Sequence, residues 1–365
     1  MDDQLFKLLE SLRLQLSGLN SKKIVTGFDG FIDSIQKVIV TQDQGKGVEY
    51  FKTMEDFGLY ITRKKAGGIS LETVETVKKL GGNAPIMANA VAQFAVNTHC
   101  IGAFGYPEID PVFADMQTNT SLHSFANPGF TSALEFTDGK IMLAQMADLN
   151  GATWELIEER IGLDQIIKII ENTDILCLLN WSEVRHTTEI WEGLLKEVFP
   201  AINQERRMKV FFDLSDCSKH DTDQIRKSLD LLQRFSVDCD VTLSLNKNEA
   251  TIVYQVIKST PVDDLEILGS GIFKFLNIHT LVIHTSGKSL AWKGLDRYQA
   301  DTFFLKNPAI STGAGDNFNA GFCIGQLLEL ETDQTLLLAN LLAACYMKNG
   351  YSPGLSELLN FGKEA

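Results

Sequence analysis

The first twenty residues show the hydrophobic pattern of an amphipathic helix. In MDDQLFKLLESLRLQLSGL the apolar side chains recur at helical spacing, and charged residues lie between them. We therefore predict that residues 1–20 form a helix packed on the main domain. After a short β-type run in KKIVTGFDGFID, residues 37–65 read as charged strands that never become strongly apolar. Half-buried strands of a small flap have this pattern, so we expect lid strands within residues 34–66.

From residue 71 onward the pattern changes to helices alternating with apolar strands, as in a parallel sheet covered on both faces. The strand candidates include DILCLLN, KVFFDLS, VTLSLN and TLVIHTS, and helical stretches such as TEIWEGLLKEVF and DQIRKSLDLLQRF lie between them. One hairpin, TSALEFTDGKIMLAQM with Asp138-Gly139 at its turn, interrupts this rhythm and adds lid strands within residues 130–147. We predict an α/β fold over residues 21–365, a single domain with a doubly wound, mostly parallel sheet and a small strand lid.

Composition narrows the functional classes. The formal net charge of −14 argues against a nucleic-acid binder, which needs lysine and arginine against phosphates. No apolar run approaches the roughly 20 residues of a membrane span, and the N-terminus has acids where a signal peptide has basic residues. The six cysteines form no C-x-x-C pair. These features predict a cytoplasmic protein with reduced, buried thiols and a small-molecule partner.

The stretch STGAGDNFNAGF combines a bare glycine turn with a carboxylate. Gly313, Ala314 and Gly315 leave backbone N–H groups uncovered at the start of a helix, which makes an anion site. Asp316 would repel a phosphate, but it suits a group that accepts the proton of an alcohol during phosphoryl transfer. The alternative is that Ser311 or Asp316 only caps the helix.

The segment SLNKNEA ends an apolar strand with Asn246 and Glu249 on one side of a helical turn. At the carboxyl end of a strand this pair could hold magnesium-bound water near a triphosphate, or it could be an ordinary capping box. The nearby Gly287-Lys288-Ser289 is no Walker A loop, because Val282 stands where that motif has a glycine.

Two further segments offer groups for a hydroxylated ligand. In LGGNAP, Gly81, Gly82 and Asn83 stand at a helix entry, where the alternative is a tight turn with an asparagine cap. In GFDGFID, Asp29 and Asp33 follow the first strand, where a carboxylate can accept hydrogen bonds from two sugar hydroxyls. The alternative for both acids is a solvated loop position.

Taken together and in this order, these segments resemble the ribokinase-like (PfkB-type) carbohydrate kinase family over about residues 22–352. The most specific element is TGAGDNFNAGF, which is similar to the C-terminal signature of that family. The resemblance implies a ribokinase-like fold, with Asp316 as catalytic base and an anion hole at Gly313, Ala314 and Gly315. It also implies that Asn246 and Glu249 lie near magnesium and phosphate.

For the ligands, the resemblance implies that Gly81, Gly82, Asn83 and Asp33 bind the sugar, with Asp29 as a competitor for the early aspartate. The strand and turn HTSGKSLAW resembles the segment flanking the nucleotide, which suggests Thr285 and Gly287. Asn340, in a helix similar to the one near the adenine, is a further expected contact.

The chain departs from the family pattern at several positions. Ile310 stands at the head of the signature, where the family has an aspartate, so we expect the monovalent-cation site of this loop to be weak. Ile86 occupies the position of the last asparagine in G-G-x-x-x-N. The spacing from Gly27 to Asp33 is one residue longer than usual.

The predicted function is ATP-dependent, Mg²⁺-requiring phosphorylation of a hydroxymethyl-type alcohol on a sugar or sugar-like substrate. One alternative is a nucleoside kinase of the same fold. Another is a catalytically weak sugar- or nucleotide-binding regulatory protein. We expect no nucleic-acid or membrane partner, and a homodimer could form through the lid.

Overall fold

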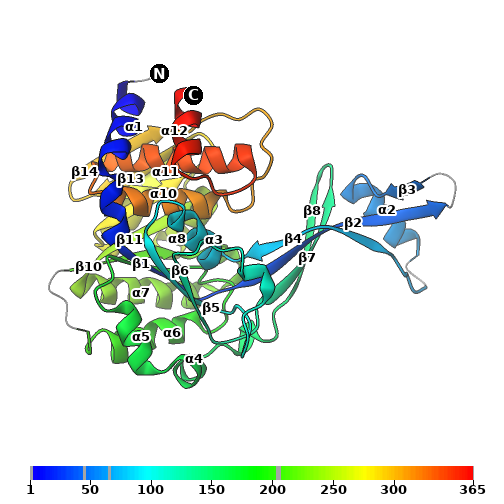
Figure 1. Ribbon diagram of the computed structural model, residues 1–365, viewed down its shortest axis with the longest axis horizontal. Coiled ribbons are helices and arrows are strands. Elements are labelled where there is room, and N and C mark those ends of the chain that lie inside the picture. The colour runs from blue at the N-terminus through cyan, green and yellow to red at the C-terminus, as the bar shows by residue number, and fades with distance from the viewer. Residues whose placement is uncertain (1–2, 44–46, 65–66, 203–206, 365) are drawn as a thin grey trace.

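The computed structural model describes residues 3–43, 47–64, 67–202 and 207–364. Among these residues one large sheet contains β1 (Lys23–Gly27), β5 (Asn97–Gly102), β6 (Thr120–Ser124), β9 (Ile175–Leu178), β10 (Met208–Asp213), β11 (Cys239–Asn246), β12 (Thr280–His284), β13 (Lys288–Lys293) and β14 (Asp296–Asp301). Their spatial order is β14-β13-β12-β11-β10-β9-β1-β5-β6 (Figure 1). The pairs from β12 to β6 are parallel, and β13 and β14 continue the sheet as antiparallel strands.

Helices cover both faces of this sheet. One face carries α1 (Asp3–Gln15), α3 (Asn83–Ala92), α10 (Ala314–Leu327), α11 (Thr332–Asn349) and α12 (Leu355–Glu364). The other carries α4 (Trp154–Ile161), α5 (Leu163–Ile170), α6 (Thr187–Gly193), α7 (Thr222–Asp238), α8 (Lys247–Lys258) and α9 (Leu265–Leu276). Short 3₁₀ segments span Leu16–Ser21, Pro111–Phe113, Leu149–Gly151 and Cys217–Lys219, and a π-helical turn spans Leu194–Val198.

Alternating side chains of the strands fill the two cores. Phe211 and Phe212 are neighbours on β10, both fully buried, and they belong to the cores on opposite faces. This arrangement confirms the predicted doubly wound α/β class. All six cysteines are buried and unpaired, as predicted. Within the part of the chain that the structure describes, no helix is both long and apolar enough to cross a membrane.

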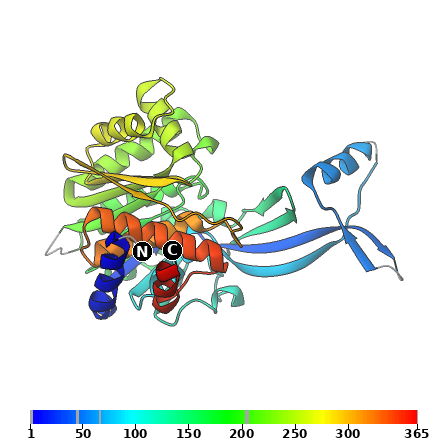
Figure 2. The same cartoon turned by 90° about the horizontal axis from the view of Figure 1, so that it is seen from above.

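A second, smaller sheet extends away from the main body (Figures 1 and 2). It contains β2 (Phe31–Asp43), β3 (Gly47–Tyr50), β4 (Thr73–Gly81), β7 (Gly129–Phe136) and β8 (Gly139–Gln145), in the order β3-β2-β7-β8 with β4 on β2. At its far end α2 (Met54–Arg63) packs Phe57 onto Phe51 and Phe136, with ring centroids 5.3 and 5.5 Å apart. We call this second sheet with α2 the lid.

The structure corrects two predictions about local structure in the lid. Residues 54–63 form a helix and not a strand, because Thr53 caps it through Asp56 N and Phe57 anchors it in the small lid core. Residues 73–81, at the start of the region in which we expected helices to alternate with apolar strands, form β4 and belong to the lid, because they pair with β2 over eight positions from Phe31↔Gly81 to Val38↔Thr73.

The main sheet brings the carboxyl ends of β1, β9, β10 and β11 to one edge. Strand β1 lies between β5 and β9, where the order of the strands reverses, and open α/β sheets bind ligands at such a switch point. Asp29 follows β1, Asn180 follows β9, Asp213 ends β10 and Asn246 ends β11. Asp29 and Asn246, both expected from the sequence, therefore lie at the edge where the fold favours a ligand, together with Asn180 and Asp213, which were not expected.

Helix α10, which carries the glycine turn at its start, approaches α11 closely at Gly321. A Cβ on Gly321 would lie 2.7 Å from Cα of Ala339, which is backbone and cannot turn aside. We predict that Gly321→Val forces the helices apart and lowers the free energy of unfolding by about 1–3 kcal/mol. Urea denaturation measures this, with Gly18→Ala as the control because nothing lies within 4 Å of that site. Equal stability of Gly321→Val and the wild type would show that the two helices are not held at this distance.

Candidate active site

The glycine turn at the start of α10 has the geometry of an anion site. Gly313 is the N-cap with φ 91°, and a Cβ there would lie 2.5 Å from the hydroxyl of Tyr346. That hydroxyl donates a 2.7 Å hydrogen bond to the carbonyl of Thr312, and Asn317 Nδ2 donates one of 2.9 Å to the carbonyl of Gly313. Hydrogen bonds from Tyr346 and Asn317 to carbonyls of the turn thus fix its conformation. The first N–H groups of the helix have no acceptor within the helix.

Asp316 lies in the first turn of α10 and is buried, with 8% of its surface exposed. Its side chain does not act as the N-cap of the helix, a position that belongs to Gly313. Burial raises the pKa of Asp316 well above its usual value, and the carboxylates of Asp213 and Asp29 raise it further. A carboxyl with a raised pKa is a stronger base, which suits proton transfer.

Asp29 is fully buried and bound to protein groups. Its oxygens accept hydrogen bonds of 2.8 Å from the backbone N–H groups of Asn83 and Ala84, at the start of α3, and one of 2.5 Å from Asn180 Nδ2. Burial raises the pKa of Asp29 to about 6 despite these bonds. Gly82 leaves room for the carboxylate, because a Cβ there would lie 2.9 Å from Asp29 Oδ2.

A residue that the sequence analysis missed, Asp213, continues this network. Its carboxylate accepts 2.6 Å from Asn319 Nδ2 on α10 and 2.8 Å from the backbone N–H of Ser215. The hydroxyl of Ser215 in turn accepts 2.9 Å from Asn83 Nδ2. Burial raises the pKa of Asp213. The signal was present in the sequence, since Asp213 ends the apolar run KVFFDLS at the carboxyl end of a strand.

Asp33 lies on β2, where the lid joins the main body. It is half-buried, accepts a hydrogen bond from Thr131 and stands opposite Lys79 of β4. A Cβ on Gly81 would lie 2.7 Å from the Asp33 carboxylate, so only glycine leaves that carboxylate open. Burial raises the pKa of Tyr346 to about 12, and the carboxylates of Asp316 and Asp33 add to this shift.

Asn246 and Glu249 form the capping box that we considered as the alternative to a ligand site. Asn246 Oδ1 accepts from Glu249 N at 3.0 Å, and the Glu249 carboxylate accepts from Asn246 N and Nδ2 at 2.8 and 2.6 Å. Glu249 is nevertheless buried beside other acids. Burial raises its pKa to about 9, and Asp213, Asp216 and Asp316 contribute to the shift. Hard oxygen donors gathered in this way fit a magnesium ion carried with a nucleotide.

A cavity of about 420 Å³ opens beside the glycine turn, within the range of ligand pockets. Ala314 and Gly315 form one side of it, and Thr285 and Asn340 also line it. Its remaining walls are mostly apolar and include Phe303, Phe304, Leu305, Phe318 and Met347. The cavity therefore combines mostly apolar walls with the backbone of the glycine turn.

Two predicted nucleotide contacts also hold the chain together. The hydroxyl of Thr285 accepts from the N–H groups of Gly287 and Lys288, so it shapes the turn in which Gly287 lies. Gly287 itself does not line the cavity. Asn340 Nδ2 donates to Ser289 Oγ at 2.8 Å and to the carbonyl of Asp301 at 3.1 Å.

Other residues around the site lacked a recognisable signal in the sequence. Partly buried His284 packs against Phe318 with the rings tilted and their centroids 4.7 Å apart, and it lines the cavity; desolvation lowers its pKa to about 4. Lys79 and Lys140 come from lid strands that carry many charges. Only the register of those strands shows which lysines face the site.

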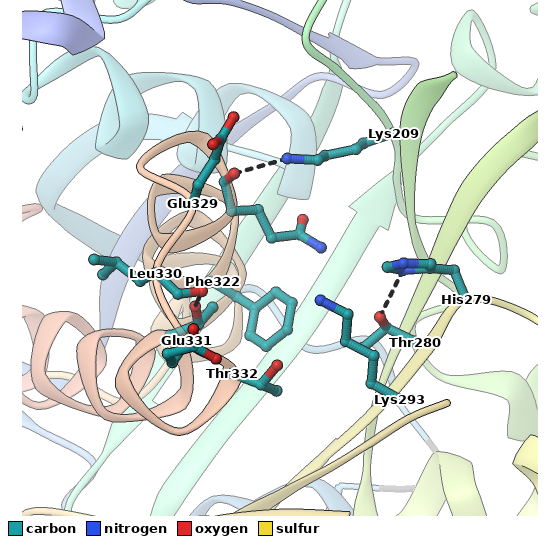
Figure 3. Close-up of a pocket in the computed structure, with 11 residues that line it drawn as sticks. Lys209, His279, Thr280, Lys293, Phe322, Glu329, Leu330, Glu331 and Thr332 are labelled. Carbon is teal, nitrogen blue, oxygen red and sulfur yellow. Dashed lines mark hydrogen bonds between the residues drawn. The ribbon is translucent and has the colours of Figure 1, made fainter. Parts of the chain in front are cut away.

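A different cavity, of about 250 Å³, lies at the opposite edge of the sheet (Figure 3). Lys209, His279 and Lys293 line it together with Phe322 and residues at the junction of α10 and α11. None of the predicted site residues lines this cavity. Among the described residues, no group of three histidine, cysteine or acidic side chains is arranged to hold a metal ion by itself.

The fold and the similarity to known proteins define a sugar kinase of the ribokinase fold. The model of the prokaryotic ketohexokinase family matches residues 1–364, so the chain belongs to that family. The resemblance noted in the sequence is thereby confirmed, and the protein is a carbohydrate kinase. Membership of a kinase family implies ATP as phosphoryl donor.

Individual relatives agree with this assignment. A ketohexokinase of Haloferax volcanii is 23% identical over 341 residues, which is 93% of this chain and 90% of the relative. A ribokinase of Thermotoga maritima is 16% identical with a TM-score of 0.63, covering 94% of this chain and 99% of that one. A nucleoside kinase of Burkholderia thailandensis, solved with inosine, is 13% identical with a TM-score of 0.62, covering 93% and 98%. The two solved structures show the fold alone.

The buried acids predict an unusual pH dependence of stability. Because the pKa of Glu249 is raised to about 9 in the folded chain, its stabilising contribution is complete below about 4.5 and is lost as the pH rises through about 9. As the pH rises between these limits, the free energy of unfolding should therefore fall in the wild type, and it should fall by about 1–3 kcal/mol less in Glu249→Gln. Urea denaturation from about pH 5 to pH 9 measures the difference, with Glu159→Gln as an exposed control. Parallel curves for Glu249→Gln and the wild type would contradict the prediction.

Proposed function

We propose that the protein is an ATP-dependent ketohexose kinase that transfers the γ-phosphoryl group to an alcohol, of the hydroxymethyl type, on its sugar. The name of the Haloferax relative and of the matching family supports the substrate class. The observation that carries the chemistry is the position of Asp316. It follows the anion turn directly, borders the network of Asp29 and Asp213, and shares Tyr346 as a neighbour with Asp33.

Asp316 is the proposed base. An alcohol resembling water, with a pKa near ~15.7, is far too weak an acid to be deprotonated in advance by an ordinary aspartate. Each pKa unit by which burial raises the pKa of Asp316 lowers the free-energy cost of moving the proton from the alcohol to this carboxylate by about 1.4 kcal/mol. The proton therefore moves late, as the bond from the sugar oxygen to phosphorus forms and the bond to the leaving ADP oxygen breaks.

The anion turn supplies the electrostatic part of the proposal. Backbone N–H groups at Gly313, Ala314 and Gly315 stabilise the charge that develops on the phosphoryl oxygens. The cavity beside the turn takes the nucleotide, with Thr285 and Asn340 in its wall and Gly287 in the turn that Thr285 shapes. Magnesium carried with ATP would neutralise phosphate charge beside Asn246 and Glu249, directly or through water. With Ile310 at the head of the loop, a monovalent-cation site stays outside the proposal.

The sugar lies, in this proposal, between the lid and the strand ends. Asp33 keeps its carboxylate open beside Gly81, so it accepts hydrogen bonds from sugar hydroxyls. Asn83 lies at the start of α3 with its amide on Ser215 and completes the sugar site with Gly82. Both carboxylate oxygens of Asp29 already accept hydrogen bonds from the start of α3 and from Asn180. Asp29 is therefore a positioning residue that holds the first residues of α3 in place.

The test of this function is ADP release with Mg-ATP against ketohexoses, aldoses, polyols and nucleosides. We predict turnover with a ketohexose and a loss of at least ~10³-fold in kcat for Asp316→Asn, because the amide cannot accept the proton. Calorimetric titration of ATP should show that the variant still binds nucleotide. Preference for a nucleoside would favour the nucleoside kinase alternative, and binding without turnover of any acceptor would favour the regulatory alternative.

The lid is part of the same proposal. In it, residues 1–20 are an accessory helix on a single kinase domain, residues 21–365, and the lid strands close over the sugar to exclude water. Two positions further along the strands, on the same face of the lid sheet as Asp33, lie the side chains of Val77 and Met142, which are 49% and 44% exposed. Apolar side chains open to solvent on a sheet favour burial against a partner, and we propose a second copy of this lid.

Sedimentation tests the homodimer. Met142→Glu should shift the protein toward the monomer, because the new carboxylate faces the partner sheet. Leu143→Glu is the matched control, since its side chain lies on the other face of β8 and is exposed to a similar degree. A wild type that sediments as a monomer, or equal effects of the two substitutions, would contradict this interface.

A further inference from the structure

A lysine of the lid reaches the glycine turn. Lys140 is the second residue of β8, and its ammonium group donates a hydrogen bond to Oγ1 of Thr312, the residue before Gly313. The two residues are 172 positions apart in the sequence. The contact brings the β7–β8 hairpin, whose turn is Thr137-Asp138, to the residue before the N-cap of α10.

Several charges meet where this hairpin approaches the site. Lys79 stands opposite Asp33 in the β2–β4 register, and the ammonium groups of Lys79 and Lys140 both lower the pKa of Asp33, against the larger effect of burial, which raises it. Burial lowers the pKa of Lys79; Asp33 opposes this shift, and Lys140 adds to it. Glu135, the cross-strand neighbour of Lys140, balances part of the charge. Two cations are therefore close together beside the anion turn.

The hydrogen bond to Thr312 by itself stabilises this position of the Lys140 side chain only weakly. A hydrogen bond to a neutral hydroxyl contributes about 0.5–1.5 kcal/mol, and ordering a lysine side chain costs up to ~2 kcal/mol. A phosphoryl group at the adjacent N–H groups would offer three charged oxygens instead. An ammonium group is an effective phosphate partner because it acts as a mobile point charge.

We propose that Lys140 is a catalytic residue whose ammonium group binds the transferred phosphoryl group when the lid is closed. The proposal rests on the proposed kinase function. Lys140 exchanges Oγ1 of Thr312 for a phosphoryl oxygen and keeps all its protons. The bond from phosphorus to the ADP oxygen breaks, the bond to the sugar oxygen forms, and the hydroxyl proton goes to Asp316.

This position makes transfer depend on the lid. Because Asp33 and Lys140 belong to the same sheet, the element that holds the sugar also delivers the charge that stabilises the transition state. With the lid open, the turn lacks that charge, and transfer to water is correspondingly slower.

Substitutions at Lys140 separate charge from hydrogen bonding. Lys140→Gln keeps a donor for Thr312 but removes the charge, and Lys140→Arg keeps the charge. We expect kcat to fall by about 10²-fold in Lys140→Gln, with a smaller change in the KM for sugar, and to be largely retained in Lys140→Arg. Lys78→Gln is the matched control, because Lys78 is an exposed lysine of β4 on the other face from Lys79.

The outcomes distinguish this proposal from the kinase function itself. Full kcat in Lys140→Gln, or an equal loss in Lys140→Gln and Lys140→Arg, overturns the role of the charge while wild-type turnover leaves the kinase function intact. A measurement without turnover completes the test. Titration calorimetry of ADP with aluminium fluoride, a mimic of the transferred group, should show at least ~10-fold weaker binding in Lys140→Gln and unchanged binding of ADP alone. Equal binding of the mimic by both proteins overturns the proposal.

Discussion

The structure depends on keeping several carboxylates buried at one edge of a parallel sheet. Asp29, Asp213, Glu249 and Asp316 each lie beside at least one of the others, and burial raises the pKa of every one. An unpaired buried charge is costly, and none of these acids has an arginine or lysine as its compensating partner among the described hydrogen bonds. Backbone N–H groups and asparagine amides take that role instead.

The polar compensation also builds the site. The N–H groups at the start of α3 and the amide of Asn180 donate hydrogen bonds to Asp29, and the amide of Asn319 donates one to Asp213. Within the capping box of α8, Asn246 donates to Glu249. These groups come from separate parts of the chain, namely α3, the segment after β9, α10 and α8. A shift in any one element would therefore unpair a buried acid, which fixes the geometry of the edge more strictly than apolar packing alone. Acids near one another store electrostatic repulsion, and this repulsion is what raises the basicity of Asp316 beyond the effect of burial.

The lid follows a different physical rule. It has its own small core around Phe51, Phe57 and Phe136, and it extends from the main body on β2, β4, β7 and β8 (Figure 2). On the face of its sheet that carries Asp33 and Lys79, the apolar side chains of Val77 and Met142 come next, and Lys140 lies beyond them toward the hairpin turn. In the proposed function, the lid therefore contributes charge and shape to the sugar side of the site, while the edge of the main sheet carries the proposed base and the glycine turn.

The fold class, the glycine turn and some polar residues after strands, such as Asp29 and Asn246, could be predicted from the sequence, because these depend on local pattern. Apolar runs with helical stretches between them imply a parallel sheet, and a Gly-Ala-Gly turn before a helix implies exposed N–H groups whatever the rest of the chain does. Only the tertiary structure decided the remainder. Asp29 and Asp33 look alike in GFDGFID, but one is bound by α3 and Asn180 and the other remains open beside Gly81. Residues 54–63 form a helix and residues 73–81 form a lid strand, because pairing and packing across the lid outweigh weak local preference. Lys140 meets Thr312 for the same reason, since strand register and chain reversal set which distant charges become neighbours.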